Sequence, residues 1–395
     1  MKKSLLLSAV MFAHTSFAAE VRFLKFGSET SILSYLDQNP SAERVHKNLM
    51  WVKTSSLDLN LSPAVVEVEK DRTYHVGPMI LDAYDQPQKA LWGIKRVAAP
   101  QAWAKGIDGS GVVVAVVDTG VNYNHPAISD NMWVNEAERN GKPGVDDDGN
   151  GFVDDIFGYN FVGNKAEPKD DMMHGSHVAG TIAGLNAKDS FYGVAPNARI
   201  MAVKSHSSKG EGTEESVVKG ILYAADNGAK IINCSWGGAP EAEKESKVLF
   251  DAIVYAGSKG AVVIASAGND STNIDLEPSY PASYQTDNLI AVASTNSDDS
   301  LSYFSNYGKK TTHVAAPGSN IFSINYRGGY TQSSGTSMAS PHVSGVAALI
   351  LQNLRNSLGR EPSAGELKAA IITNTETVGT VSSRVVSGIS TASQL

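Results

Sequence analysis

The feature that most limits the fold of this chain is an alternation of short apolar, β-branched runs with longer segments of helical periodicity. The apolar runs are Gly111–Val117, Arg199–Val203, Lys230–Asn233, Ala261–Ala265, Leu289–Ala293 and His313–Ala315. The helical segments between and after them are His174–Leu185, Glu214–Asn227, Ala242–Lys259 and Ser337–Asn353. Strands that are buried on both faces and joined through helices form parallel sheets covered on both sides. We therefore expect an α/β fold with a doubly wound, mostly parallel sheet.

The N-terminal part of the chain has a different pattern. Residues 19–85 contain a short apolar strand over 21–26, a helical segment over Thr30–Leu36, and two further apolar alternations near Leu49–Val52 and Ala64–Val68. This predicts a small α+β unit of roughly 65 residues, which would be marginally stable alone. Residues 74–90 have weak periodicity and two prolines, and they are interpreted as a linker.

Residues 1–18 have the composition of a secretory signal peptide. Two lysines precede an apolar run, and Ser16 and Ala18 place small residues at the −3 and −1 positions of a cleavage site after Ala18. No later run is long enough to predict a membrane anchor. Cys234 is the only cysteine, so an intramolecular disulfide is impossible. The net charge of −8 argues against nucleic acid as a partner, because phosphate binding requires a basic face.

Four polar residues lie at the ends of predicted elements, where doubly wound sheets bind their ligands. Asp118 and Asn269 end apolar runs, and His174 and Ser337 begin helical segments. Asp, His and Ser together indicate nucleophilic acyl transfer: a histidine takes the serine proton, and a carboxylate orients the histidine. The tetrahedral oxyanion needs donors already in place. The backbone N–H of Ser337 and the side-chain amide of Asn269 are the candidates.

The sequences around these residues resemble the signature blocks of the subtilases, the subtilisin-like serine proteases. The blocks are VVDTGV around Asp118, HGSHVAGTIAG from His174, ASAGN ending at Asn269, and GTSMASPHVSGVAALI around Ser337. Their order is the order of that family. The resemblance extends from about Leu91 to the end of the chain and implies a subtilisin-like serine endopeptidase. It assigns Asp118 as the orienting carboxylate, His174 as general base and acid, Ser337 as nucleophile and Asn269 as oxyanion donor. Ser176 stands where the family usually has threonine.

The same resemblance implies a proenzyme. Residues 19–85 are similar to the family's propeptide, a foldase and intramolecular inhibitor that is removed by self-cleavage, and residues 86–395 would be the peptidase domain. The processing site is expected between Tyr74 and Lys89. The mature enzyme would be a secreted or periplasmic monomer that cleaves proteins and peptides.

Substrates of this family bind as an added strand between two enzyme segments. The matching segments are Lys209–Gly212 and Ser235–Gly238, so Gly210, Gly212, Ser235, Trp236 and Gly237 are expected to bind substrate. Gly268 and Ser279 would complete the pocket for the side chain before the scissile bond. No charged residue is clearly placed inside, although Glu277 is close in sequence. We expect broad specificity with an uncharged residue at that position.

The segment VDDDGNGFVDD, residues 145–155, holds five carboxylates in eleven residues. It lies in an acidic insertion of about residues 130–171, between Asp118 and His174. Asp146, Asp148, Asn150 and Gly151 fit positions 1, 3, 5 and 6 of a calcium loop, although Phe157 stands where an EF-hand has its bidentate glutamate. Asp155 and the carbonyl of Phe152 would complete an oxygen shell. Structural Ca²⁺ is the predicted cofactor; a solvated acidic turn and Mg²⁺ or another hard cation are the alternatives.

Other functions are compatible with parts of this pattern. A catalytically silent member of the same fold could serve as a calcium-dependent scaffold, although it would not need the four site residues intact. A narrow processing protease acting on partner proteins is a further alternative. His174 and His177 share a helix face, but no third ligand lies at a usual zinc spacing. Cys234 is interpreted as a small core residue, since no cationic neighbour in sequence would activate its thiol.

Overall fold

The computed structural model describes residues 21–55, 64–77, 80–81, 91–238 and 245–395. The proposed signal peptide therefore lies outside the described residues. The described chain divides into two compact units, with the boundary between Asp71 and Arg72. Among the described residues, no helix combines the length and the apolar character that are needed to cross a membrane.

The first unit is an antiparallel sheet in the order β2-β3-β1-β4 with one helix, α1 (Glu29–Gln38). The strands are β1 (Arg22–Phe26), β2 (Glu43–Arg44), β3 (Trp51–Thr54) and β4 (Val65–Lys70). A small core holds the helix on the sheet, and its buried members are Leu24, Phe26, Ile32 and Val52. The predicted strand, helix and apolar alternations all correspond to elements of this unit.

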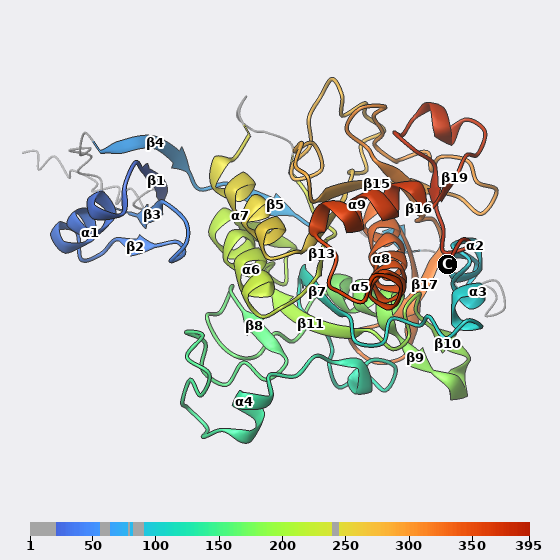
Figure 1. The fold of residues 1–395 in the computed structure, drawn as a ribbon, viewed down its shortest axis with the longest axis horizontal. Coiled ribbons are helices and arrows are strands. Elements are labelled where there is room, and N and C mark those ends of the chain that lie inside the picture. Colours follow the sequence, from blue (N-terminus) through green and yellow to red (C-terminus); the bar gives the residue numbers. More distant parts are fainter. Residues whose placement is uncertain (1–20, 56–63, 78–79, 82–90, 239–244) are drawn as a thin grey trace, which may run out of the picture. The chain divides into compact units, whose positions relative to one another are not determined.

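The second unit is built on a nine-stranded sheet in the order β19-β20-β16-β15-β14-β13-β7-β11-β8 (Figure 1). All neighbouring strands are parallel except β19 and β20. The strands are β7 (Val113–Asp118), β8 (Gly158–Asn160), β11 (Arg199–Lys204), β13 (Ile231–Cys234), β14 (Val262–Ser266), β15 (Leu289–Thr295), β16 (Val314–Pro317), β19 (Thr375–Glu376) and β20 (Ile389–Ser390). The α/β fold with a mostly parallel sheet is confirmed.

Helices cover both faces of this sheet. They are α2 (Trp92–Arg96), α3 (Ala99–Trp103), α5 (His174–Ala183), α6 (Glu214–Asp226), α7 (Lys247–Ser258), α8 (Thr336–Leu358) and α9 (Ala364–Thr373). The short helix α4 (Glu136–Asn140) lies in the acidic insertion. Val114 and Val116 of β7 belong to the core that also contains residues of α5 and α8. Val117, which points to the other face, lies against Gly220 of α6. Figure 1 shows α6 beside α7, and α5 beside α8.

Smaller elements complete the second unit. They are β5 (Thr73–His75), β6 (Ile80–Leu81), β9 (Leu185–Asn186), β10 (Phe191–Tyr192), β12 (Glu211–Thr213), β17 (Ile321–Ile324), β18 (Tyr330–Ser334) and the short 3₁₀ turns η2 (Ser129–Asn131), η3 (Ala187–Asp189) and η4 (Val381–Ser383). The linker interpretation of residues 74–90 is wrong where these residues are described, because β5 pairs with β12 and β6 pairs with β18. Main-chain hydrogen bonds hold such strands without any side-chain periodicity.

Candidate active site

Asp118 and His174 form a hydrogen-bonded pair beneath the surface. Asp118 is the last residue of β7 and His174 is the first residue of α5, and both side chains are fully buried. Nδ1 of His174 lies 2.8 and 2.9 Å from the two carboxylate oxygens of Asp118. Nε2 of His174 is buried without a hydrogen-bond partner in the part of the chain that the structure describes. An imidazole held by a carboxylate at one nitrogen and open at the other is arranged to accept a proton there.

Ser337 and Asn269 meet at the N-terminus of α8. The Ser337 hydroxyl donates to the carbonyl of Ser235 at 2.9 Å, and the Ser235 hydroxyl donates to the carbonyl of Ser337 at 3.0 Å. Oδ1 of Asn269 accepts from the backbone N–H and the hydroxyl of Thr336, at 2.9 and 3.0 Å. This fixes the orientation of the amide and leaves Nδ2 as a donor. A Cβ built on Gly77 would lie 2.7 Å from that Nδ2.

A buried carboxylate, Asp170, ties the two loops of the Asp118–His174 pair together. It accepts from the hydroxyl of Thr119 at 2.9 Å and from the hydroxyl and N–H of Ser176 at 2.6 and 2.9 Å. It also accepts from the N–H groups of Met172 and Met173, both at 2.9 Å. Burial raises the pKa of Asp170 above its ordinary value. The small hydroxyl at position 176 is therefore a structural contact at the start of the helix that carries His174.

The residues from β5 to Gly77 lie between the two segments predicted to bind substrate. β5 pairs antiparallel with β12, so that Tyr74 faces Gly212. The N–H of Val76 donates to the carbonyl of Gly210 at 3.0 Å. His75 exchanges two backbone hydrogen bonds with Gly237, each of 3.0 Å. An extended segment of this chain thus occupies the groove in the way expected for an added peptide strand.

The other residues predicted to bind substrate surround this strand. Trp236 is fully buried; its Nε1 donates to the carbonyl of Val117 at 2.8 Å, and its ring packs against Tyr74. Oγ of Ser279 lies 3.5 Å from a Cβ built on Gly237. Gly268 has φ +107° and donates its N–H to the hydroxyl of Thr336 at 3.1 Å, so its backbone lies beside the N-terminus of α8. The Trp236 ring thus packs against Tyr74, which is the strand residue three positions before Gly77.

The acidic insertion brings Glu138, Asp148 and Asp155 together. Each offers an oxygen that lies within 4.8 Å of the others. Asp155 and Glu138 are buried, and Asp148 is exposed. Burial raises the pKa of Asp155 to about 6, although the hydrogen bonds that the carboxylate accepts from Tyr223 at 2.5 Å and Asn150 at 3.1 Å lower this pKa. Three carboxylates at this separation form an oxygen-only cluster that could hold a metal ion.

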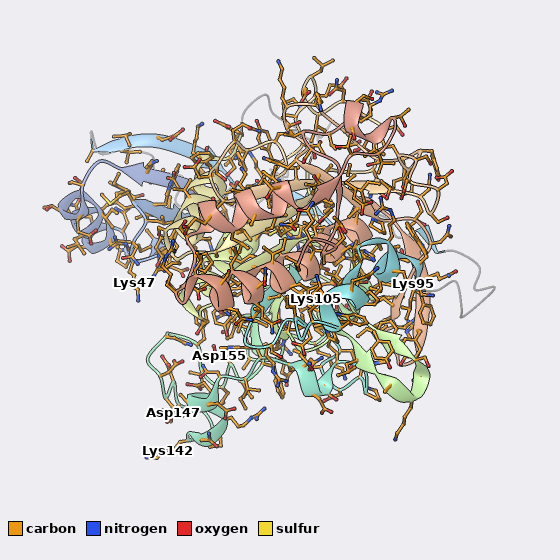
Figure 2. The ribbon with its side chains drawn as sticks, turned by 45° about the vertical axis from the view of Figure 1, so that its right-hand side comes forward. Lys47, Lys95, Lys105, Lys142, Asp147 and Asp155 are labelled. Carbon is orange, nitrogen blue, oxygen red and sulfur yellow. The ribbon has the colours of Figure 1, made fainter. Side chains whose placement is uncertain are left out.

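The remaining loop residues have different contacts. Asp146 accepts from the N–H groups of Gly149 and Gly151, both at 2.8 Å, and Asn150 accepts from the N–H of Phe152 at 2.8 Å. The Phe152 ring packs against Tyr159, Phe161 and Tyr223. Figure 2 shows Asp147 at the outer part of the insertion and Asp155 nearer the sheet. Asp146, Asn150 and Phe152 remain predicted ligands.

Several buried groups have structural contacts. Nε2 of His177 lies 2.9 Å from the backbone carbonyl oxygen of Ile321, which can only accept, so the ring donates its Nε2–H to that oxygen. Burial lowers the pKa of His177 to about 3. Cys234 is buried, and burial raises the pKa of its thiol. Cys234 thus agrees with its interpretation as a core residue, and the buried His177 has a structural contact.

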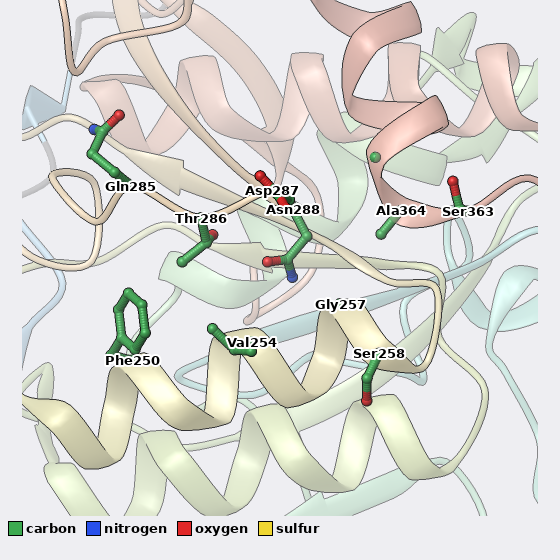
Figure 3. A pocket seen from close by; sticks show the side chains of 11 residues that line it. Phe250, Val254, Gly257, Ser258, Gln285, Thr286, Asp287, Asn288, Ser363 and Ala364 are labelled. Carbon is green, nitrogen blue, oxygen red and sulfur yellow. The ribbon is translucent and has the colours of Figure 1, made fainter.

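A pocket outside these clusters lies between α7, the loop before β15 and the start of α9 (Figure 3). Its lining includes Phe250, Val254, Thr286 and Ala364, and none of the predicted site residues. Asn288 in its wall donates to the carbonyls of Ile253 and Ala261, which is a structural use of a polar side chain. We do not assign the site to this pocket.

Three carboxylates near these sites were not predicted from the sequence. Glu138 lies on a short helix seven residues before the acidic segment 145–155, and Glu214 begins α6, where an acidic residue is ordinary. Asp170 stands four residues before His174 without a periodic signal. The sequence signal for Glu138 would have been the high density of acidic residues across the whole insertion.

Comparison with known proteins places this chain in a family. Residues 109–388 match the model of the Subtilase family, Peptidase_S8. Thermitase of Thermoactinomyces vulgaris is 41% identical over 281 residues, covering 71% of this chain and 86% of thermitase. The major intracellular serine protease of Bacillus subtilis (strain 168) is 37% identical, covering 76% of this chain and 86% of that protein. A crystal structure of a cold adapted subtilisin-like serine proteinase matches with a TM-score of 0.59 and 32% identity, over 77% of this chain and 97% of that chain.

Proposed function

We propose that Asp118, His174 and Ser337 are the catalytic triad of this chain, which belongs to the subtilase family and is a subtilisin-like serine endopeptidase. Its substrates are therefore proteins. The observation that carries the proposal is the buried His174 ring, which Asp118 holds at Nδ1 while Nε2 has no partner among the described residues.

In this mechanism the Ser337 hydroxyl leaves its contact with Ser235 and turns to Nε2 of His174. His174 takes the hydroxyl proton as Oγ attacks the carbonyl carbon, and Asp118 stabilises the imidazolium that forms. Nδ2 of Asn269 and the backbone N–H of Ser337 donate to the oxyanion. His174 then gives the proton to the leaving amine. The Asn269 assignment is supported by the contacts of its Oδ1 with Thr336, which leave Nδ2 available.

The test is Ser337→Ala in the full chain. We expect loss of casein hydrolysis and of removal of the N-terminal region, because no other hydroxyl is proposed to attack. Ser357→Ala is the matched control, since Ser357 is exposed near the end of the same helix, α8. Processing that continues in Ser337→Ala would refute the assignment. Labelling of the native protein by a serine-directed fluorophosphonate would separate an active enzyme from a silent scaffold of this fold.

We also propose that the chain is made as a secreted proenzyme and matures to a monomer. The backbone hydrogen bonds of His75 and Val76 with Gly237 and Gly210 support an inhibitory strand in the substrate groove. The processing site proposed between Tyr74 and Lys89 falls partly on residues 78–79 and 82–89, which lie outside the described residues. Mass spectrometry of the mature N-terminus would locate both proposed cleavages.

Specificity at the scissile bond is proposed to be broad, with an uncharged residue before that bond. Ser279 beside Gly237, and Gly268 beside Asn269, would form the pocket. Cleavage profiling with a peptide library checks this, and cleavage only after arginine or lysine would overturn it. Such profiling also distinguishes a general protease from a narrow processing enzyme.

We propose further that the acidic insertion binds a structural Ca²⁺ ion. The donors fit this ion because they are all oxygen atoms, and because the buried carboxyl of Asp155 lies beside two other carboxylates. Glu138, Asp148 and Asp155 would hold it, with Asp146, Asn150 and the carbonyl of Phe152 as further predicted ligands. Bound calcium would supply positive charge that offsets the repulsion between these groups.

A further inference from the structure

The groove encloses one side chain of the strand almost completely. Tyr74 lies three residues before Gly77, and only 3% of it is exposed. Its ring meets the ring of Trp236 edge-on, with centroids 5.3 Å apart. A Cβ built on Gly238 would lie 3.4 Å from Cδ1 of Tyr74, so the glycine backbone closes another side. This part of the groove is shaped for an aromatic ring.

A buried carboxylate lies at the tip of that ring. Glu214, the first residue of α6, is fully buried, and its Oε1 accepts from the Tyr74 hydroxyl at 3.2 Å. The same oxygen lies 3.3 Å from a guanidinium nitrogen of Arg72, and the N–H of Glu214 donates to the carbonyl of Arg72 at 2.7 Å. Burial, and next the negative charge of Glu214, hold the pKa of Tyr74 well above its ordinary value. The phenol therefore remains a hydrogen-bond donor throughout the neutral pH range.

We infer that Glu214 is a specificity-determining residue that selects substrates with a tyrosine three positions before the residue at the scissile bond. A basic residue two positions further upstream adds to the recognition, as Arg72 does. This rests on the proposed function, because β5 is taken to occupy the groove as a substrate would. Gly77, whose backbone lies next to Nδ2 of Asn269, is taken as the residue before the scissile bond. A phenylalanine fills the same space but gives the buried carboxylate no proton, and an acidic side chain would repel it.

The first experiment does not depend on catalysis. In the full chain carrying Ser337→Ala, hydrogen exchange of residues 72–77 reports how often the strand leaves the groove. Tyr74→Phe and Glu214→Met should each raise the exchange of this segment roughly tenfold, the usual effect of one such hydrogen bond, and the double variant should add little. Glu215→Gln is the matched control on the next residue of α6, and exchange of β14 monitors the fold. Additive effects would overturn the inference, as would unchanged exchange in Glu214→Met.

The second experiment measures selection among substrates. Two quenched peptides that differ only by tyrosine or phenylalanine at the recognised position are compared with the self-processed enzyme. The tyrosine peptide should have a kcat/KM roughly tenfold higher, and Glu214→Met should bring the ratio near one, whereas Glu215→Gln should preserve it. If Glu214→Met folds poorly, Glu214→Gln should still lower the ratio. An equal kcat/KM for both peptides would refute the inference. If no peptide is cleaved, the proposed function fails, and the exchange experiment still decides the role of Glu214.

Discussion

Replacing Glu138 with glutamine should remove most of the stabilisation that calcium gives to this protein. Glu138 and Asp155 are the two buried members of the acidic cluster, and Asp148 is the exposed one. Glu136→Gln is the matched control, because Glu136 lies on the same helix, α4, and is exposed beside Arg139. The two variants remove the same charge two residues apart.

The size of the effect follows from the spacing of the carboxylates. At the 4.8 Å limit, and at an effective dielectric constant of about 20, two unit charges repel by about 3.5 kcal/mol. The pairs that include exposed Asp148 are screened to about 1 kcal/mol each, so the pair of Glu138 and Asp155 dominates. A cation that balances these charges with a Kd of about 10 µM would stabilise the fold by about 4 kcal/mol at 10 mM Ca²⁺. For a unit of this size that is a rise in Tm of about 8 °C.

The assay is thermal unfolding of the Ser337→Ala chain, which prevents autolysis, in calcium and in chelator. Without calcium, Glu138→Gln should unfold near the parent protein, because relief of the repulsion offsets the loss of its carboxylate contacts. Those contacts are hydrogen bonds from the N–H groups of Asp147 at 2.7 Å and Asp154 at 2.8 Å. With calcium, the parent and Glu136→Gln should gain about 8 °C, and Glu138→Gln should gain at most about 2 °C.

Two results would contradict this reasoning. An equal calcium-induced rise in Glu138→Gln and Glu136→Gln would show that Glu138 is not a ligand. No rise in the parent protein would refute the calcium proposal while leaving the protease assignment intact. Asp146→Asn tests the ligand predicted from the loop pattern in the same way, since its carboxylate also accepts backbone N–H groups of the loop.

Three further predictions concern buried groups. Asp170→Asn should lower kcat on the order of 100-fold in peptide assays, because the variant loses a carboxylate oxygen that accepts hydrogen bonds at the start of α5. Glu167→Gln should leave kcat unchanged. An unchanged kcat in Asp170→Asn would show that Asp170 does not position His174. Burial lowers the pKa values of His177 and His342 to about 3 and about 4. In the folded protein these two imidazoles therefore stay neutral at pH values where, in the unfolded chain, their pKa near 6.5 lets them take up protons. The contribution of these histidines to the free energy of unfolding should be fully present above pH 6.5 and should fall below it, by up to about 1.4 kcal/mol per pH unit for each histidine. Urea unfolding at several pH values should show a smaller slope of this free energy against pH for His342→Gln. An unchanged slope would contradict the assignment. Iodoacetamide should modify Cys234 only in urea, as read by mass spectrometry, and rapid labelling of the native protein would reveal a reactive thiol.

The central sheet could be predicted from the sequence because its strands are continuous apolar runs. The run Leu289–Ala293 is an example, and β15 extends it to Thr295. Helix ends were less predictable: α8 continues to Leu358, five residues past the expected end, and stops where Gly359 adopts φ +64°. The helical periodicity fades in its exposed last turn, so the pattern underestimates its length.

The site could be predicted only where local sequence carries the chemistry. Asp118 and His174 belong to recognisable blocks, and the structure brings them into contact. Glu138 joins the acidic cluster through tertiary folding, which no local spacing encodes. The strand β5 was missed for a related reason, since its partners Gly212 and Gly237 are distant in sequence and pair through the main chain.

A strand that fills a groove within its own chain competes with substrates at an effective concentration set by its covalent connection. Such connections commonly give values on the order of 1 mM, so a free peptide of equal affinity at about 1 µM would occupy the groove about one time in a thousand. After the connection is cut, the strand competes only at its bulk concentration. For the segment from β5 to Gly77, a single peptide bond thus changes occupancy by orders of magnitude without altering any contact in the groove.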